Sequence, residues 1–165
     1  LEFARFQELP RLIAPTALEI AVNAGKTRRT PRHLLAHKGW RVVDPAKVCP
    51  DLDTYRNYIE SSKAEWSVAK NGYVVGRSGW FSCRSACYLA AGRPVAVQDT
   101  GFGAVLPTGE GLLAFSTVEE AVASIKEIEA NYERHAKAAR EIAEEYFDAT
   151  TVLTHLVEEA MNGHG

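Results

Sequence analysis

Apolar residues along the chain follow two patterns, a helical spacing of three to four positions and short uninterrupted runs. The helical spacing predicts helices over residues 16–25, 30–39, 51–62 and 82–91. The short runs, bounded by Pro, Gly or Asp, predict strands over residues 40–44, 65–69, 94–99 and 112–115. Because helices and strands alternate, the sequence predicts an α/β fold: a Rossmann-like, three-layer domain with one parallel sheet of about four strands.

The remainder of the chain predicts a C-terminal helical segment of three helices. Ser116 and Glu119 have the spacing of a capping box at the start of the first helix. The second helix covers about 133–146, and Asp148 is expected to cap the third. The apolar residues of these helices, expected to face the core, are Val118, Ala121, Val122, Ile125, Ile128, Ala136, Ala139, Ile142, Ala143, Val152, Leu153, Leu156 and Val157.

The pattern assigns residues 31–165 to a single domain and leaves the place of residues 1–30 open. The chain starts at Leu1, and its single methionine is Met161. The opening Leu-Glu-Phe therefore resembles a cloning remnant, or else the chain is a fragment of a longer protein.

The composition of the chain limits the kinds of partner and environment that the sequence predicts. The net charge is −2 and the basic residues are dispersed, so the sequence gives no indication of a nucleic-acid partner. No apolar run approaches the roughly 20 residues of a membrane-spanning helix. Three cysteines in 165 residues do not form a disulfide framework, and we expect a reduced, cytoplasmic protein.

The segment from Gly76 to Gly103 carries the candidate chemistry. Ligands of parallel α/β sheets sit at the carboxyl ends of the strands, where the loops after Ala69 and Asp99 are expected. The candidate binding residues in these loops are Arg77, Ser78, Gly79, Trp80, Ser82, Arg84, Ser85, Asp99, Thr100, Gly101 and Phe102.

These residue types suit a phosphate. Ser82 can cap the following helix, whose first N–H groups and dipole attract anions. Arg77 and Arg84 bracket the loop with guanidinium groups that bind phosphate in bidentate fashion. The alternative is an ordinary strand-to-helix loop, since neither a G-x-G-x-x-G fingerprint nor a Walker loop is present.

The run RSGWFSCRSACYLAAGRPVAVQDTGFGAVLPTGEGLLAFSTVEEAVASI resembles the C-terminal nucleotide-sugar-binding domain of GT-B glycosyltransferases, most closely the bacterial family-1-like and CgeB-like group. The resemblance extends over roughly residues 39–160. It implies that residues 77–85 bind the diphosphate of a nucleoside diphosphate sugar and that residues 99–102 face the same cleft.

The resemblance also implies a partner and leaves the catalytic residues unknown. A GT-B enzyme has a second, N-terminal Rossmann-like domain that holds the acceptor and often the catalytic base, and this chain is long enough for one domain only. Two glutamates that many retaining members carry would fall at Gly79 and Cys87 and are absent here, so the stereochemical outcome stays open. We expect the isolated chain to bind nucleotide without transferring sugar.

Two other functions stay open at this stage. One is a stand-alone small-molecule-binding module. The other is a small hydrolase of an ester, lactone or phosphate, with a divalent cation held by Asp51, Asp53 or Asp99. No G-x-S-x-G elbow supports a serine hydrolase, and Asp51 and Asp53 are better explained as helix-capping residues.

Histidines and cysteines add weaker candidates. His33 and His37 have a metal-binding spacing without a third ligand nearby, which favours surface histidines. His135 and His155 are expected at the solvent edge of their helices. Cys83 and Cys87 are expected to pack as small side chains rather than to bind zinc.

Overall fold

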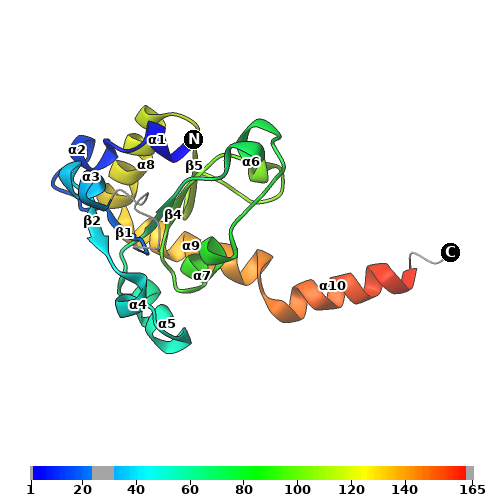
Figure 1. The fold of residues 1–165 in the computed structure, drawn as a ribbon. Helices are drawn as coiled ribbons and strands as arrows, with labels where there is room; N and C mark the ends of the chain where they lie inside the picture. The colour runs from blue at the N-terminus through cyan, green and yellow to red at the C-terminus, as the bar shows by residue number, and fades with distance from the viewer. Residues whose placement is uncertain (1, 24–31, 163–165) are drawn as a thin grey trace.

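The computed structural model describes residues 2–23 and 32–162, which form an α/β arrangement with two parallel sheets (Figure 1). The larger sheet has the order β3 (Glu65–Ser67), β4 (Val95–Gln98), β5 (Leu112–Phe115). The smaller pairs β1 (Glu19–Ala21) with β2 (Arg41–Val43). The predicted α/β class and parallel pairing are therefore confirmed, whereas the single sheet of about four strands is wrong.

Helices α1 (Glu2–Arg5) and α2 (Leu9–Leu12) precede the first strand, and from β1 onward each strand is followed by at least one helical element. The later helical elements are α3 (Arg32–His37), α4 (Pro45–Val48), α5 (Leu52–Ser61), α6 (Asn71–Val75), α7 (Cys83–Ala90), the 3₁₀ helix η1 (Phe102–Ala104), α8 (Val118–Ala130), α9 (Tyr132–Tyr146) and α10 (Ala149–Asn162). Thr30 and Pro31, expected to begin α3, lie outside the described residues.

The larger sheet is the middle of three layers. Successive strand residues point to opposite faces, so Val95 and Val97 pack with helices α5, α7 and α9, whereas Ala96 faces the other way. On that second face, Leu113 and Phe115 pack against α8 and the buried side chains of Phe6, Leu9 and Ile13. The layered, Rossmann-like expectation is therefore consistent with the larger sheet.

Residues 16–23, the described part of the helix predicted over 16–25, do not form a helix. Residues 19–21 form strand β1, which pairs in parallel with β2 in the register Glu19 to Arg41 and Ala21 to Val43, while residues 24 and 25 lie outside the described part. Only a few apolar residues supported the helical spacing. The ladder to β2 outweighs that weak local preference.

Aromatic packing fills the junction between the two sheets. The rings of Trp40, just before β2, and Trp66, in β3, lie with centroids 5.6 Å apart. Phe3 contacts both rings at 5.5 and 6.4 Å, and Phe115 stacks on Trp66. Side-chain packing rather than ladder hydrogen bonding therefore joins β2 to β3. The short apolar runs in the sequence predict strands, but they do not show which strands pair.

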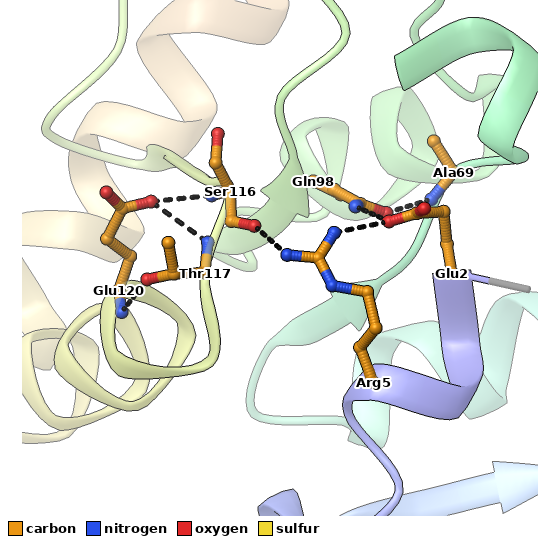
Figure 2. Close-up of polar contacts among 7 residues, drawn as sticks. All are labelled: Glu2, Arg5, Ala69, Gln98, Ser116, Thr117 and Glu120. Atoms are coloured by element: carbon orange, nitrogen blue, oxygen red, sulfur yellow. Dashed lines mark hydrogen bonds and ion pairs between the residues drawn. The ribbon is translucent and has the colours of Figure 1, made fainter. Parts of the chain in front are cut away.

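The capping box of α8 begins one residue later than predicted (Figure 2). Thr117 Oγ1 accepts from the Glu120 backbone N–H at 3.1 Å, and Glu120 Oε2 accepts from the backbone N–H groups of Thr117 and Ser116. The pairing of Ser116 with Glu119 is therefore wrong. Both pairs have the same spacing, and the end of β5 at Phe115 decides between them.

The C-terminal helices correct two further expectations. Asp148 caps α10 as predicted, accepting from Thr151 N–H at 2.8 Å, but every residue of α10 is exposed and the helix extends away from the body (Figure 1). Its apolar residues Val152, Leu153, Leu156 and Val157 therefore do not face the core. Conversely, His135 of α9 is fully buried rather than at the solvent edge.

Within residues 2–23 and 32–162, none of the helices has the length and apolar character that crossing a membrane requires.

Candidate functional site

A small pocket lies where strands β3 and β4 end and helix α7 begins. Its volume is about 10 Å³, which is room for one water-sized group. Strands β3 and β4 and the residues just after β3 contribute part of the wall. The loop before α7, the first turn of α7 and η1 contribute the rest. The lining residues are Ser67, Ala69, Trp80, Phe81, Ser82, Ser85, Val97, Gln98 and Phe102.

The first turn of α7 faces this pocket. Ser82 is in extended conformation, and its Oγ accepts from the Arg84 N–H at 3.2 Å, so it is the N-cap that the sequence predicts. The N–H groups of Cys83 and Ser85 in the first turn have no carbonyl four residues earlier within the helix. The helix start therefore combines donors with the positive end of the helix dipole.

Ser85 supplies an unpartnered polar group in the same turn. Its side chain is fully buried, and its Oγ has no hydrogen-bond partner among the described residues. A buried hydroxyl without a partner is unfavourable by about 1–3 kcal/mol. Because Ser85 lines the pocket, a group that enters it can satisfy this hydroxyl.

Gln98, the last residue of β4, is fully engaged at the other side of the pocket (Figure 2). Its Oε1 accepts from the Ala69 N–H at 3.2 Å, and its Nε2 donates to Glu2 Oε2 at 2.6 Å. That hydrogen bond, joined by Arg5, outweighs burial and lowers the pKa of Glu2. Arg5 also donates to the Ser116 carbonyl, so helix α1 is bonded to the ends of both β4 and β5.

Two loops are joined at the rim of the pocket. Arg77 Nη1 forms an ion pair with Asp99 Oδ2 at 3.1 Å, and Asp99 Oδ1 accepts from the Gly101 N–H at 2.7 Å. Gly79 N–H donates to the Thr100 carbonyl at 2.8 Å, and Thr100 Oγ1 donates to the Trp80 carbonyl at 2.6 Å. The segments 77–80 and 99–101, both singled out from the sequence, therefore meet.

Backbone geometry shows how close the two loops are. Gly101 has a φ of +92°, and a Cβ placed there would lie 3.1 Å from the Arg77 carbonyl oxygen. Arg77 itself has a φ of +42°, in the left-handed region that a non-glycine residue rarely adopts. Backbone strain of this kind persists only where surrounding contacts impose it.

Arg84 is directed differently from Arg77. Its Nε donates to Glu65 Oε1 at 2.6 Å, and the Glu65 side chain is only 4 % exposed. Burial opposes the charge of Arg84, but attraction to Glu65 prevails and raises the pKa of its guanidinium. Glu65 is the first residue of β3, whereas the pocket lies at the strand's other end. The exposed cation at the rim is therefore Arg77, with 68 % of its side chain accessible.

The structure thus gathers most of the predicted residues. Trp80, Ser82, Ser85 and Phe102 line the pocket. The rim consists of Arg77, Gly79, Asp99, Thr100 and Gly101, while Ser78 is exposed and bonds through its N–H to the Tyr73 carbonyl.

The candidate residues did not include the lining residues Ser67, Ala69, Phe81, Val97 and Gln98. They also did not include Tyr73, which stacks on Trp80 with a centroid distance of 5.1 Å. A signal for Gln98 was present, because a polar residue closes an otherwise apolar strand.

Most of the histidines, cysteines and aspartates that were weaker candidates lie on the surface or cap a helix. His33 and His37 are exposed, as expected for surface histidines, and Asp51 caps α5 by accepting from the Thr54 N–H at 2.8 Å. Cys83 and Cys87 are exposed rather than packed, so that expectation is wrong. In the described part of the chain, no three His, Cys, Asp or Glu side chains are grouped as metal ligands.

No protein-family model matches this chain, and no curated protein or solved structure matches it significantly.

Proposed function

We propose that the chain is the donor-binding half of a GT-B-like glycosyltransferase and holds the diphosphate of a nucleotide sugar at the start of α7. The observation that carries this proposal is Ser85, a fully buried hydroxyl without a partner in the first turn of a helix whose N-terminus borders a pocket. A phosphate oxygen accepts from this hydroxyl and from the adjacent N–H groups, and the helix dipole favours its charge.

The position of the pocket also supports the proposal. It lies at the carboxyl ends of two neighbouring parallel strands, the usual location of ligands in open α/β sheets. Arg77 at the rim supplies a cation with most of its side chain in solvent. Arg84 is already paired with a buried carboxylate, so we assign it to the support of α7 and not to the diphosphate.

The proposal leaves the transfer chemistry to a second domain. The residues around the pocket bind and orient, and among them we assign none to acid–base or nucleophilic catalysis. A hydrolase assisted by a metal finds no grouped ligands among residues 2–23 and 32–162. A stand-alone binding module uses the same pocket, and only the presence of an acceptor domain separates it from a transferase half.

Calorimetry of the full chain with inorganic pyrophosphate, UDP, GDP, ADP and dTDP, each with and without Mg²⁺, tests this function. We expect one nucleoside diphosphate to bind and to raise the melting temperature by mass action. Ser85→Ala should weaken binding about tenfold, since a hydrogen bond to a charged group contributes about 1.5–3 kcal/mol. The matched control is Ser124→Ala, a buried serine of α8 on the other side of the sheet. Absence of binding by every probe would refute the proposal.

A further inference from the structure

The pocket is too small for the ligand that its chemistry suits. Its volume of about 10 Å³ holds one water-sized group, whereas a phosphate group has five heavy atoms. Ser67, Val97, Gln98 and Ser85 in its wall belong to β3, β4 and α7, whose backbones are fixed by the strand ladder and the helix. Of the lining residues outside these elements, Trp80 is the exposed one.

Residues 76–80, here called the rim loop, have little to hold them. All five are exposed. The neighbouring Phe81 is anchored, because it stacks on Phe147 and packs edge-on against Phe102. Within the loop, Trp80 stacks on Tyr73 of α6, and the N–H groups of residues 76–78 donate to carbonyls of α6, so the loop and α6 can move as one piece. Segments with few buried contacts open most readily.

Three polar contacts hold the rim loop against residues 99–101. The Gly79 N–H donates to the Thr100 carbonyl, the Thr100 hydroxyl donates to the Trp80 carbonyl, and Arg77 forms an ion pair with Asp99. An anion at the pocket competes with Asp99 for the Arg77 guanidinium. Arg77 also holds a left-handed backbone conformation that opening would release.

We infer that the rim loop is a lid over the start of α7, that it is held closed by the Arg77–Asp99 pair, and that it must open before a phosphate reaches Ser85. The inference rests on the proposed function for the identity of the ligand. The opening itself is a property of the chain alone and can be measured without any ligand.

Thiol labelling of the full chain measures this opening. Ser85→Cys, made with Cys49, Cys83 and Cys87 replaced by serine, places one thiol behind the lid, and its reaction with a disulfide reagent reports access. We expect Asp99→Asn to accelerate labelling about two- to fivefold, the range of effect of an exposed ion pair. The matched control is Glu144→Gln, which breaks the exposed Arg140–Glu144 pair on α9 and should leave the rate unchanged.

The outcomes test the lid and the proposed ligand independently of each other. Equal labelling rates in the Asp99→Asn and Glu144→Gln variants would overturn the lid. The lid would also be overturned if the Ser85→Cys chain were labelled as fast as a chain whose single thiol is the exposed Cys83. If Ser85→Cys does not fold, amide exchange of residues 83–85 in the otherwise native chain gives the same comparison. Failure of pyrophosphate and every nucleotide to bind in calorimetry overturns the proposed function and leaves the labelling result standing.

Discussion

At the amino edge of the β3–β4–β5 sheet, Gly111 lies directly against helix α9, and its N–H donates to Nδ1 of the fully buried His135 at 3.1 Å. At the carboxyl edge, residues 76–80 are exposed, a small pocket remains, and the buried hydroxyl of Ser85 has no partner in the described part of the chain. The amino edge is not closely packed throughout, because a hollow of about 280 Å³ lies beside Gly109 and Glu110, and buried polar atoms of Glu65 and Arg93 have no partner among the described residues. The comparison is therefore between the Gly111 contact, which stabilises the fold, and the Ser85 hydroxyl, which a ligand can satisfy.

The largest effect is expected at Gly111. A Cβ at this position would lie 2.4 Å from the Ala139 backbone nitrogen, and the φ of +70° is unfavourable for any other residue. Gly111→Ala should lower the free energy of unfolding by more than about 3 kcal/mol, because steric overlap with a helix backbone adds to left-handed strain. Urea unfolding measures this loss.

Gly109→Ala separates the two contributions. Gly109 has a φ of +116° but open space around the position of a Cβ, so only strain of about 1–2 kcal/mol should appear. Equal losses in the two variants would show that α9 does not pack closely against the amino edge.

The next effect is expected at His135. His135→Ala removes the acceptor of the Gly111 N–H and leaves a cavity, and it should cost about 2–4 kcal/mol of unfolding free energy. Thermal and urea unfolding both measure this change. His33→Ala on the exposed surface of α3 is the control and should change stability by less than about 0.5 kcal/mol. A mild effect at His135 would remove the contrast between the edges.

A smaller effect is expected at Gly101 on the carboxyl edge. A Cβ there would lie 3.1 Å from the Arg77 carbonyl, so Gly101→Ala adds a close contact to left-handed strain and should cost about 1–3 kcal/mol. Gly79→Ala, with a φ of +71° and open space, should cost about 1 kcal/mol. If Gly79→Ala were the more destabilising variant, the two rim segments would not be in contact.

The smallest effect concerns Glu2, which joins helix α1 to Gln98. Its lowered pKa means that the carboxylate stabilises the fold above the ordinary pKa of 4.5 and that this contribution is lost as the pH falls through the folded value. Glu2→Gln should destabilise by less than about 1 kcal/mol at pH 6 and by progressively less as the pH falls below 4.5, as measured by urea midpoints. Glu133→Gln, at an exposed glutamate of α9, is measured beside it as the control.

Local signals in the sequence correctly predicted the N-cap of α7 and the polar segment that follows β4, while the binding role of these residues stays a prediction. Ser82 caps the helix, and the polar residues around Asp99 follow a buried strand, because capping and strand ends are encoded by near neighbours. The pairing of Arg84 with Glu65 was not predictable in this way, since it links residues 19 apart through the tertiary fold. The burial of His135 depends likewise on Gly111, which is 24 residues away.

Amphipathic spacing had the same limit in the C-terminal helices. It predicted both α9 and α10, yet α9 buries Ala139, Ile142 and Ala143 while α10 buries nothing. The spacing reports that a helix has an apolar face. Whether another element covers that face depends on the direction in which the chain leaves Phe147, which no local pattern specifies.

Because α10 is exposed, we expect it to unfold separately from the rest of the chain. A helix of 14 residues that buries none of them is marginal in water, because nucleation is costly and packing supplies most helical stability. On heating, residues 149–162 should therefore lose helical structure gradually, before the body melts in one cooperative transition. Circular dichroism should then show a sloping baseline below the main transition, and a chain that ends at Asp148 should show a flat baseline with the same melting temperature.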